Sequence, residues 1–134
     1  MDYLLSVKMH ALITTGRTGS DFFQSLCDSH SQIITFNGIL WFHNFWENSL
    51  CVKSGNISLP DLVKEFAGKN IEKLKSKYDL FERKEALGVN KDKSVNIDII
   101  SFENHVINLL DGREVNSKNV LLAVYGAYSL SLNQ

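Results

Sequence analysis

The chain has 134 residues, of which 44% are hydrophobic and 22% are charged, and its formal net charge at pH 7 is −1. This composition is typical of a globular protein with one hydrophobic core, and it excludes an intrinsically disordered tail. The near-zero charge supplies no general electrostatic attraction to nucleic acid or to an anionic membrane. We therefore expect a single domain over residues 1–134 that binds no nucleic acid.

The cysteine spacing and the lengths of the apolar runs indicate in which cellular compartment the protein lies. Cys27 and Cys51 lie far apart and form neither a Cys-x-x-Cys pair nor a metal-ligand spacing. The stretch 1–15 is broken by charged and polar residues, and no apolar run approaches the ~20 residues of a membrane span. These features predict reduced thiols, no bound metal, no membrane span and a cytoplasmic location.

The first forty residues predict a strand, a glycine-containing loop, a helix and a second strand. Residues 9–15 end in a short apolar run with β-branched residues, which is typical of a buried strand. Apolar residues from Phe22 to Cys27 recur at helical spacing and predict a helix with a buried face, and residues 32–36 predict the second strand. This order favours an α/β fold with a parallel sheet and flanking helices.

The rest of the chain is predicted to be rich in helices. The amphipathic or apolar stretches that predict them are Ser58 to Leu74, Phe102 to Leu110 and Val120 to Leu132. Ser58 and Ser117 are the expected caps, and Asp111-Gly112 ends the middle helix. Only residues 95–99 offer a further strand, and two strands do not make a stable sheet. Either the helices dominate the packing, or the chain is the N-terminal portion of a longer protein.

The segment between the first predicted strand and the first predicted helix has the features of an anion-binding loop, and it reads Thr14-Thr15-Gly16-Arg17-Thr18-Gly19-Ser20-Asp21. The first amides of a helix lack partners within the helix and carry a partial positive charge, and glycines let the backbone turn them toward one anion. The Arg17 guanidinium can bind two oxygens of a phosphate or sulfate. The glycine spacing matches neither a Walker A loop nor G-x-G-x-x-G. The alternative is a plain connection in which Ser20 caps the helix and Arg17 is solvated.

A longer stretch resembles a known family, and it reads Gly16-Arg17-Thr18-Gly19-Ser20-Asp21-Phe22-Phe23-Gln24-Ser25-Leu26-x-Asp28-Ser29-His30. It resembles the 5′-phosphosulfate-binding loop and first helix of the sulfotransferase family, most closely the branch that acts on carbohydrates. The strong part of the resemblance covers Leu12 to about Gly38. It implies a P-loop-like α/β fold with a donor-binding core at 8–38 and a helical region at 39–134. It also implies transfer of a sulfuryl group from 3′-phosphoadenosine-5′-phosphosulfate (PAPS) to a hydroxyl or amine acceptor, with a carbohydrate as one candidate and no metal.

The resemblance also implies roles for individual residues. Arg17 would be catalytic, because it falls where the family places a basic residue on the bridging or 5′-phosphate oxygens and would stabilise the charge that develops as the sulfuryl group departs. The residues expected to bind the cofactor are Gly16, Arg17, Thr18, Gly19, Ser20 and Asp21. The chain departs from the family at Ile39, where relatives carry an acid, so no general base is assigned. The family's 3′-phosphate signature is not found between residues 81 and 134.

Other side chains and other functions stay open. His43 and Glu47 lie four residues apart and could act as a base, but packing of His43 among the aromatic residues of 41–46 is the favoured interpretation. The three functions considered are a sulfotransferase that binds PAPS or adenosine 3′,5′-bisphosphate, an inert relative that at most binds an anion, and a small α-rich interaction domain. Two ways to complete the expected fold and donor site stay open: a homo-oligomer, or a C-terminal portion that is missing from this sequence.

Overall fold

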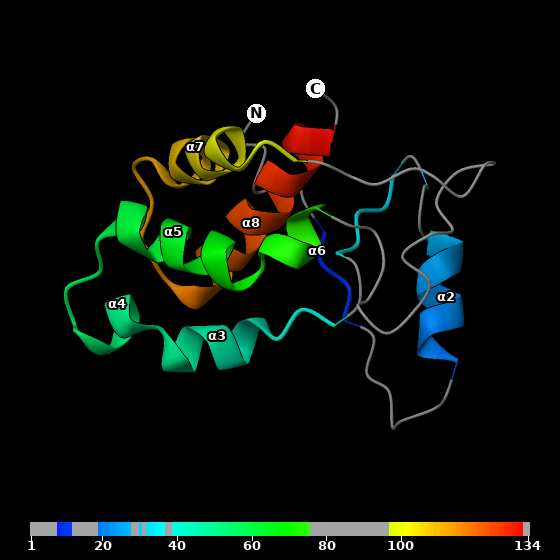
Figure 1. Ribbon diagram of the computed structural model, residues 1–134, viewed down its shortest axis with the longest axis horizontal. Coiled ribbons are helices and arrows are strands. Elements are labelled where there is room, and N and C mark those ends of the chain that lie inside the picture. Colours follow the sequence, from blue (N-terminus) through cyan, green and yellow to red (C-terminus); the bar gives the residue numbers. More distant parts are fainter. Residues whose placement is uncertain are drawn as a thin grey trace.

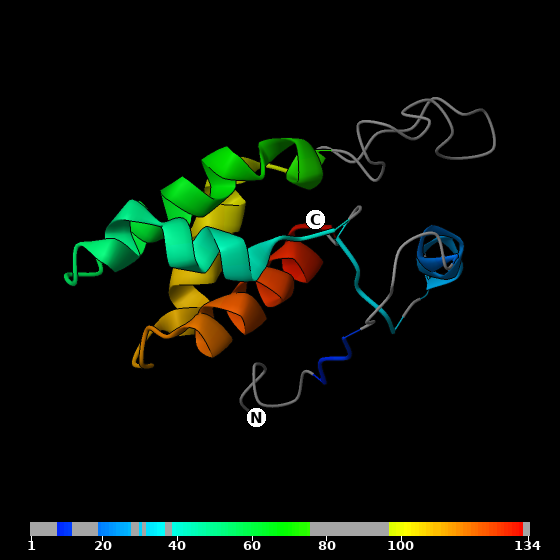
Figure 2. The same ribbon diagram turned by 90° about the horizontal axis from the view of Figure 1, so that it is seen from below.

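The computed structural model describes residues 8–11, 19–27, 30, 32–36, 39–75 and 97–132, and these residues form helices but no strand. In chain order the helices are α2 (Ser20–Cys27), α3 (Phe42–Asn48), α4 (Leu50–Lys53), α5 (Leu59–Lys69), α6 (Ile71–Lys75), α7 (Ile99–Leu110) and α8 (Ser117–Leu132). Helices α3 to α8 gather in one helical body, and α2 stands apart from it (Figure 1). Seen from below, the same separation is clear (Figure 2).

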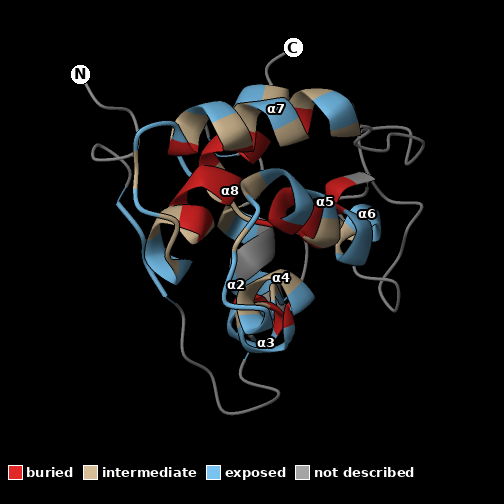
Figure 3. Cartoon of the chain, turned by 90° about the vertical axis from the view of Figure 1, so that its left-hand side faces the viewer, coloured by how far each residue is buried: buried red, intermediate tan, exposed pale blue. Residues whose placement is uncertain are grey.

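The core of the helical body lies around α8. Helices α7 and α8 follow one another through a short turn and pack together, α5 packs on α7, and α3 packs on α8. Buried residues occur on several sides of α8 and on the inward sides of α5 and α7 (Figure 3). The ring of Phe66 contacts the rings of Phe45 and Phe102, with centroid distances of 5.2 Å and 6.4 Å. These contacts join α3, α5 and α7 through one aromatic cluster.

The helices predicted over 58–74, 102–110 and 120–132 are confirmed, although the first is divided at Asn70 into α5 and α6 and the caps differ in detail. Asp98 caps α7, because its side chain accepts a hydrogen bond from the Ser101 amide at 2.6 Å, and this bond lowers the pKa of Asp98. Asn116 caps α8 by accepting from the Asn119 amide at 2.9 Å, so the cap precedes the expected Ser117 by one residue. Ser58 holds the cap position of α5, although its side chain makes no capping bond.

The predicted α/β fold with a P-loop-like parallel sheet is wrong for the part of the chain that the structure describes. Residues 32–36 form a turn followed by backbone that pairs with no strand, and residues 8–11 are irregular as well. Ile97 and Asp98 lead directly into α7, so the strand expected at 95–99 is also wrong over its described residues. The apolar side chains Ile34 and Phe36 pack against the helical core, and this contact takes the place of pairing with a neighbouring strand.

Helix α2 begins where the sequence predicts it, but its surroundings differ. Phe22, Phe23 and Leu26, expected to face a core, are 69%, 52% and 62% exposed. Cys27, expected in the core, is only half-buried. Of the helices that the structure describes, none combines the length and the apolar character that crossing a membrane would need.

We predict opposite effects for two glycine-to-alanine substitutions. Gly112 follows α7 with φ +69°, a left-handed conformation that costs other residues about 1–2 kcal/mol, so Gly112→Ala lowers the free energy of unfolding by about 1 kcal/mol. Gly68 is an exposed residue inside α5, and a Cβ there would meet nothing within 4 Å. Gly68→Ala therefore raises the free energy of unfolding by about 0.5–1 kcal/mol. Urea unfolding followed by circular dichroism measures both, and shifts in the same direction would contradict this account.

Candidate functional site

The loop that carries the resemblance is described only at its C-terminal end. Gly16, Arg17 and Thr18 lie outside the described residues, so the catalytic role of Arg17 and the roles of its two neighbours stay predictions. Gly19 has φ +79°, and the Phe23 amide donates to the Gly19 carbonyl at 2.9 Å. A positive-φ glycine therefore stands immediately before the first turn of α2, where an anion-binding loop needs a sharp change of direction.

The first residues of α2 supply the remaining expected donors. Ser20 and Asp21 are the first two residues of the helix, and their amides belong to the first turn. A Cβ placed on Gly19 would meet nothing within 4 Å, so the backbone at this junction faces open space. The structure thus brings together three of the six expected binding residues, Gly19 to Asp21, at one helix start.

The apolar residues of α2 form one side of the helix. Viewed down the helix axis, positions i, i+1 and i+4 lie within an arc of about a quarter to a third of a full turn. We therefore call Phe22, Phe23 and Leu26 the α2 apolar face. All three are more than half exposed. This is the largest local departure from the sequence interpretation, which assigned the same residues to a core.

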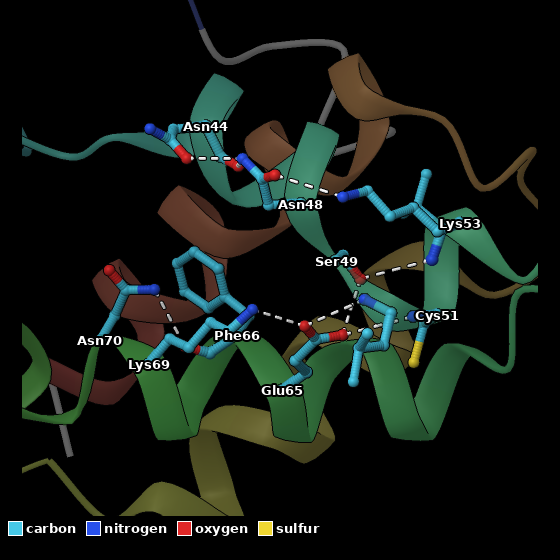
Figure 4. Close-up of polar contacts among 11 residues, drawn as sticks. Asn44, Asn48, Ser49, Cys51, Lys53, Glu65, Phe66, Lys69 and Asn70 are labelled. Atoms are coloured by element: carbon cyan, nitrogen blue, oxygen red, sulfur yellow. Dashed lines mark hydrogen bonds and ion pairs between the residues drawn. The ribbon is translucent and has the colours of Figure 1, made fainter.

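A carboxylate inside the helical body collects several donors (Figure 4). Glu65 of α5 accepts from the Ser49 hydroxyl at 2.7 Å and from the Lys69 ammonium at 2.6 Å. It also accepts from the amides of Leu50 and Cys51, at 3.2 Å and 3.4 Å. Those two amides belong to the first turn of α4, whose N-terminus therefore meets a negative charge supplied by another helix.

These contacts fix the charge of Glu65. Desolvation by burial would raise its pKa, but the hydrogen bonds from Lys69, Ser49 and the amides of Leu50 and Cys51 outweigh it and lower the pKa to about 2. Burial and the neighbouring Glu65 carboxylate raise the pKa of the Cys51 thiol, which keeps it protonated and a weak nucleophile at neutral pH.

The cluster around Glu65 stabilises the fold. Ser49 is fully buried; its hydroxyl donates to Glu65, and its oxygen accepts from the Val52 amide at 3.3 Å. The Ser49 hydroxyl donates one hydrogen bond, accepts another and is closed off from solvent. It is therefore not placed to attack a substrate. The cluster ties the junction of α3 and α4 to α5. Sequence reasoning missed it, because Ser49 and Glu65 are sixteen residues apart and no local pattern joins them.

The other candidate residues do not assemble a reactive site. His43 and Glu47 are both exposed on α3, so the expected packing of His43 among aromatic side chains is wrong. His30 closes the turn after α2, where its Nδ1 accepts from the Gln32 amide at 3.2 Å. Within the described residues, no three His, Cys, Asp or Glu side chains are grouped so that they could hold a metal ion.

The comparisons with known proteins give no match among family models, curated proteins or solved structures. The resemblance to sulfotransferases therefore stays a prediction that rests on the stretch from Leu12 to about Gly38.

We predict that Glu65→Gln weakens the fold at neutral pH and changes its acid sensitivity. The amide would point an NH₂ group at groups that are themselves donors, which costs about 1–3 kcal/mol. Because the folded-state pKa lies below the ordinary value of 4.5, the stabilisation is complete above pH 4.5 and is lost as the pH falls toward 2.

The measurement is urea unfolding at pH values between 7 and 2.5, with Glu47→Gln as the control because Glu47 is exposed on α3. The free energy of unfolding of wild type and of the control should fall as the pH decreases. That of Glu65→Gln starts lower and should fall by less. If the free energy of unfolding of Glu65→Gln and of wild type falls equally with pH, the Glu65 carboxylate does not supply the stabilisation described here.

Proposed function

We propose that the chain is a small α-rich interaction domain, and that the α2 apolar face is its contact with a partner protein. The observation that carries this proposal is the exposure of Phe22, Phe23 and Leu26 on a helix that stands apart from the helical body. The helical body meanwhile has its own buried core. Among the described residues, the core is therefore built without the side chains of the α2 apolar face.

The chemistry of the α2 apolar face indicates the kind of partner. A short helix with apolar side chains on one side fits an apolar groove on another protein, in which a few anchors carry most of the binding free energy. Complete burial of each of these side chains contributes roughly 1.5–3 kcal/mol. Two phenylalanines and a leucine on eight residues are enough for a weak and specific contact.

A cytoplasmic location belongs to this proposal. Cys27 and Cys51 are both free thiols, which suits a reducing compartment. The location is inferred from these two residues and from the absence of apolar runs long enough for a membrane span in the sequence.

A second candidate function is binding of PAPS or adenosine 3′,5′-bisphosphate at the loop before α2, with sulfuryl transfer to a hydroxyl, amine or carbohydrate acceptor. The observation that favours it is the positive φ of Gly19 directly before the first turn of α2. The α-rich body supports the interaction domain better, because it provides no sheet among the described residues to hold the loop.

We predict that a photoreactive benzoylphenylalanine in place of Phe22 crosslinks the chain to a partner in cells that express it. The matched control carries the same residue in place of Asn104, which is exposed on α7. A discrete crosslinked species should form from position 22, disappear when Phe23→Ser and Leu26→Ser are added, and be absent from position 104. The same products from both positions, or none from position 22, would overturn the proposal.

For the second candidate we predict calorimetric binding of adenosine 3′,5′-bisphosphate in the micromolar range, abolished by Arg17→Ala. Lys118→Ala removes one positive charge from the exposed first turn of α8 and is the control. Loss of binding with Arg17→Ala alone would support a donor site at the loop. If titration of the folded chain with adenosine 3′,5′-bisphosphate releases no heat, the chain has no working donor site and the second candidate function is excluded.

A further inference from the structure

One aromatic and two amide side chains form an exposed row along α3. Trp41, Asn44 and Asn48 stand at positions i, i+3 and i+7, which lie on one side of a helix. Trp41 is 67% exposed, and both asparagines are exposed as well. We call these three residues the α3 outer row. The row faces solvent, while Phe42 and Phe45 of the same helix are buried in the core.

Hydrogen bonds fix the asparagine end of the α3 outer row. Asn48 Nδ2 donates to the Asn44 carbonyl at 2.9 Å and to Asn44 Oδ1 at 2.8 Å. The Lys53 ammonium of α4 donates to Asn48 Oδ1 at 3.3 Å, so the three side chains are joined in sequence (Figure 4). Asn44 Nδ2 donates to no acceptor among the described residues. Its hydrogens and the two remaining hydrogens of the Lys53 ammonium can therefore bind a partner.

A second lysine lies at the other end of the row. The Lys73 ammonium of α6 donates to the Ile39 carbonyl at 2.5 Å, two residues before the row begins. Lys53 and Lys73 thus each contact a neutral oxygen. Among the described residues, the lysine within ion-pair distance of a carboxylate is Lys69, whose partner is Glu65. The two lysines at the ends of the row are not neutralised in this way.

The acidic residues of the same two helices lie off the row. Glu47 is exposed on α3, about a quarter of a turn around the helix from the middle of the α3 outer row. Glu72 is exposed on α6, about 100° around the helix from Lys73. The positive charge at both ends of the row is therefore complementary to an acidic partner.

We propose that the α3 outer row binds an extended acidic peptide segment of a partner protein. An apolar side chain of the peptide packs on Trp41, and acidic side chains at its two ends pair with Lys53 and Lys73. The asparagines suit a peptide, because a carboxamide carries the same kinds of donor and acceptor as a peptide bond. The row is about 10 Å long at 1.5 Å per residue. Because an extended chain rises about 3.3 Å per residue and both lysines lie beyond the row, the two acids stand roughly four to six positions apart.

A peptide fits this surface better than a nucleic acid does. Binding of single-stranded nucleic acid also uses exposed aromatic rings and lysines, but its affinity depends on neutralising many phosphates. The chain has a net charge of −1 and offers two lysines at this row. The α3 outer row goes beyond the proposed function, because it shares no residue with the α2 apolar face and would bind a partner of different chemistry.

The first test selects peptides from a displayed library of random sequences, with the whole chain as the target. Peptides that also bind the chain with Lys53→Gln and Lys73→Gln are removed at each round, which discards those that bind elsewhere. The enriched peptides should carry an apolar residue between two acidic ones at the expected spacing. A selection that enriches no peptide, or that enriches peptides without an excess of acidic residues, would overturn the proposal.

The second test measures the Kd of the enriched peptides by tryptophan fluorescence. In Trp46→Phe, Trp41 is the remaining tryptophan of the chain, and peptide binding should move its emission to shorter wavelength. Lys53→Gln with Lys73→Gln should raise the Kd roughly tenfold or more, and added salt should raise it in the wild type. The control is Lys64→Gln, which removes an exposed charge from the outer side of α5 and should leave the Kd unchanged.

Circular dichroism checks that each variant is folded. If the double variant does not fold, Lys53→Gln alone carries the test, because Lys53 is exposed and its one bond is to an exposed side chain. An unchanged Trp41 emission, or equal Kd values for Lys53→Gln and Lys64→Gln, would overturn the proposal. Tighter binding of a single-stranded oligothymidylate than of any enriched peptide would also overturn it, in favour of nucleic acid.

One further pair of substitutions separates this surface from the proposed function. Phe23→Ser with Leu26→Ser removes two side chains of the α2 apolar face and should leave the Kd of the enriched peptides unchanged. A higher Kd in this variant would place the peptides on α2 and overturn the assignment to the α3 outer row. Failure of the crosslink from position 22 would leave the peptide Kd as it is, so the two surfaces fail separately.

Discussion

The fold depends on covering α8. Its sixteen residues are apolar on nearly every side, and buried positions include Val120, Val124 and Tyr128. A helix of this kind is stable in water only when other elements surround it, because the hydrophobic effect scales with the apolar area removed from solvent. Helix α7 covers one side and α3 another, and the ring of Phe36 covers part of a third.

The position of α3 over α8 requires an anchor, and Glu65 supplies it. Helix α3 has seven residues, too few to be stable by itself. Glu65 holds Ser49, where α3 ends, and also the first amides of α4. Because the pKa of Glu65 is lowered to about 2, the carboxylate is charged at neutral pH and keeps its hydrogen bonds there. The aromatic contact of Phe45 with Phe66 adds a second attachment between α3 and α5.

The sequence predicted α5, α7 and α8 because their signals are local. The apolar spacing of α5, α7 and α8 and the glycine after α7 all lie within one or two turns of the residues they organise. The Glu65 cluster could not be predicted, since it depends on how two segments meet. The strand predicted at 32–36 failed for the same reason: an apolar, β-branched run specifies burial, and only the rest of the chain decides between a sheet and a helical core.

Beside the candidate site, the sequence predicted the start of α2, because the signal for a helix start is local. A glycine before an amphipathic run predicts a helix start after a sharp turn, and Gly19 with α2 has this form. The exposure of Phe22, Phe23 and Leu26 could not be predicted, because amphipathic spacing gives the same pattern for a face that meets the core and a face that meets a partner. Only the arrangement of α2 outside the helical body separates the two.

The same arrangement decides how strongly the loop before α2 could hold an anion. A helix N-terminus carries about half a positive charge, and in contact with water and salt its attraction for an anion is largely screened. A phosphate loop at the edge of a sheet gains strength because the preceding strand fixes its backbone around the anion. Among the residues described here, no strand fixes Gly19. The fixed charge and paired donors of the Arg17 guanidinium are the strongest contribution to such binding that the sequence offers.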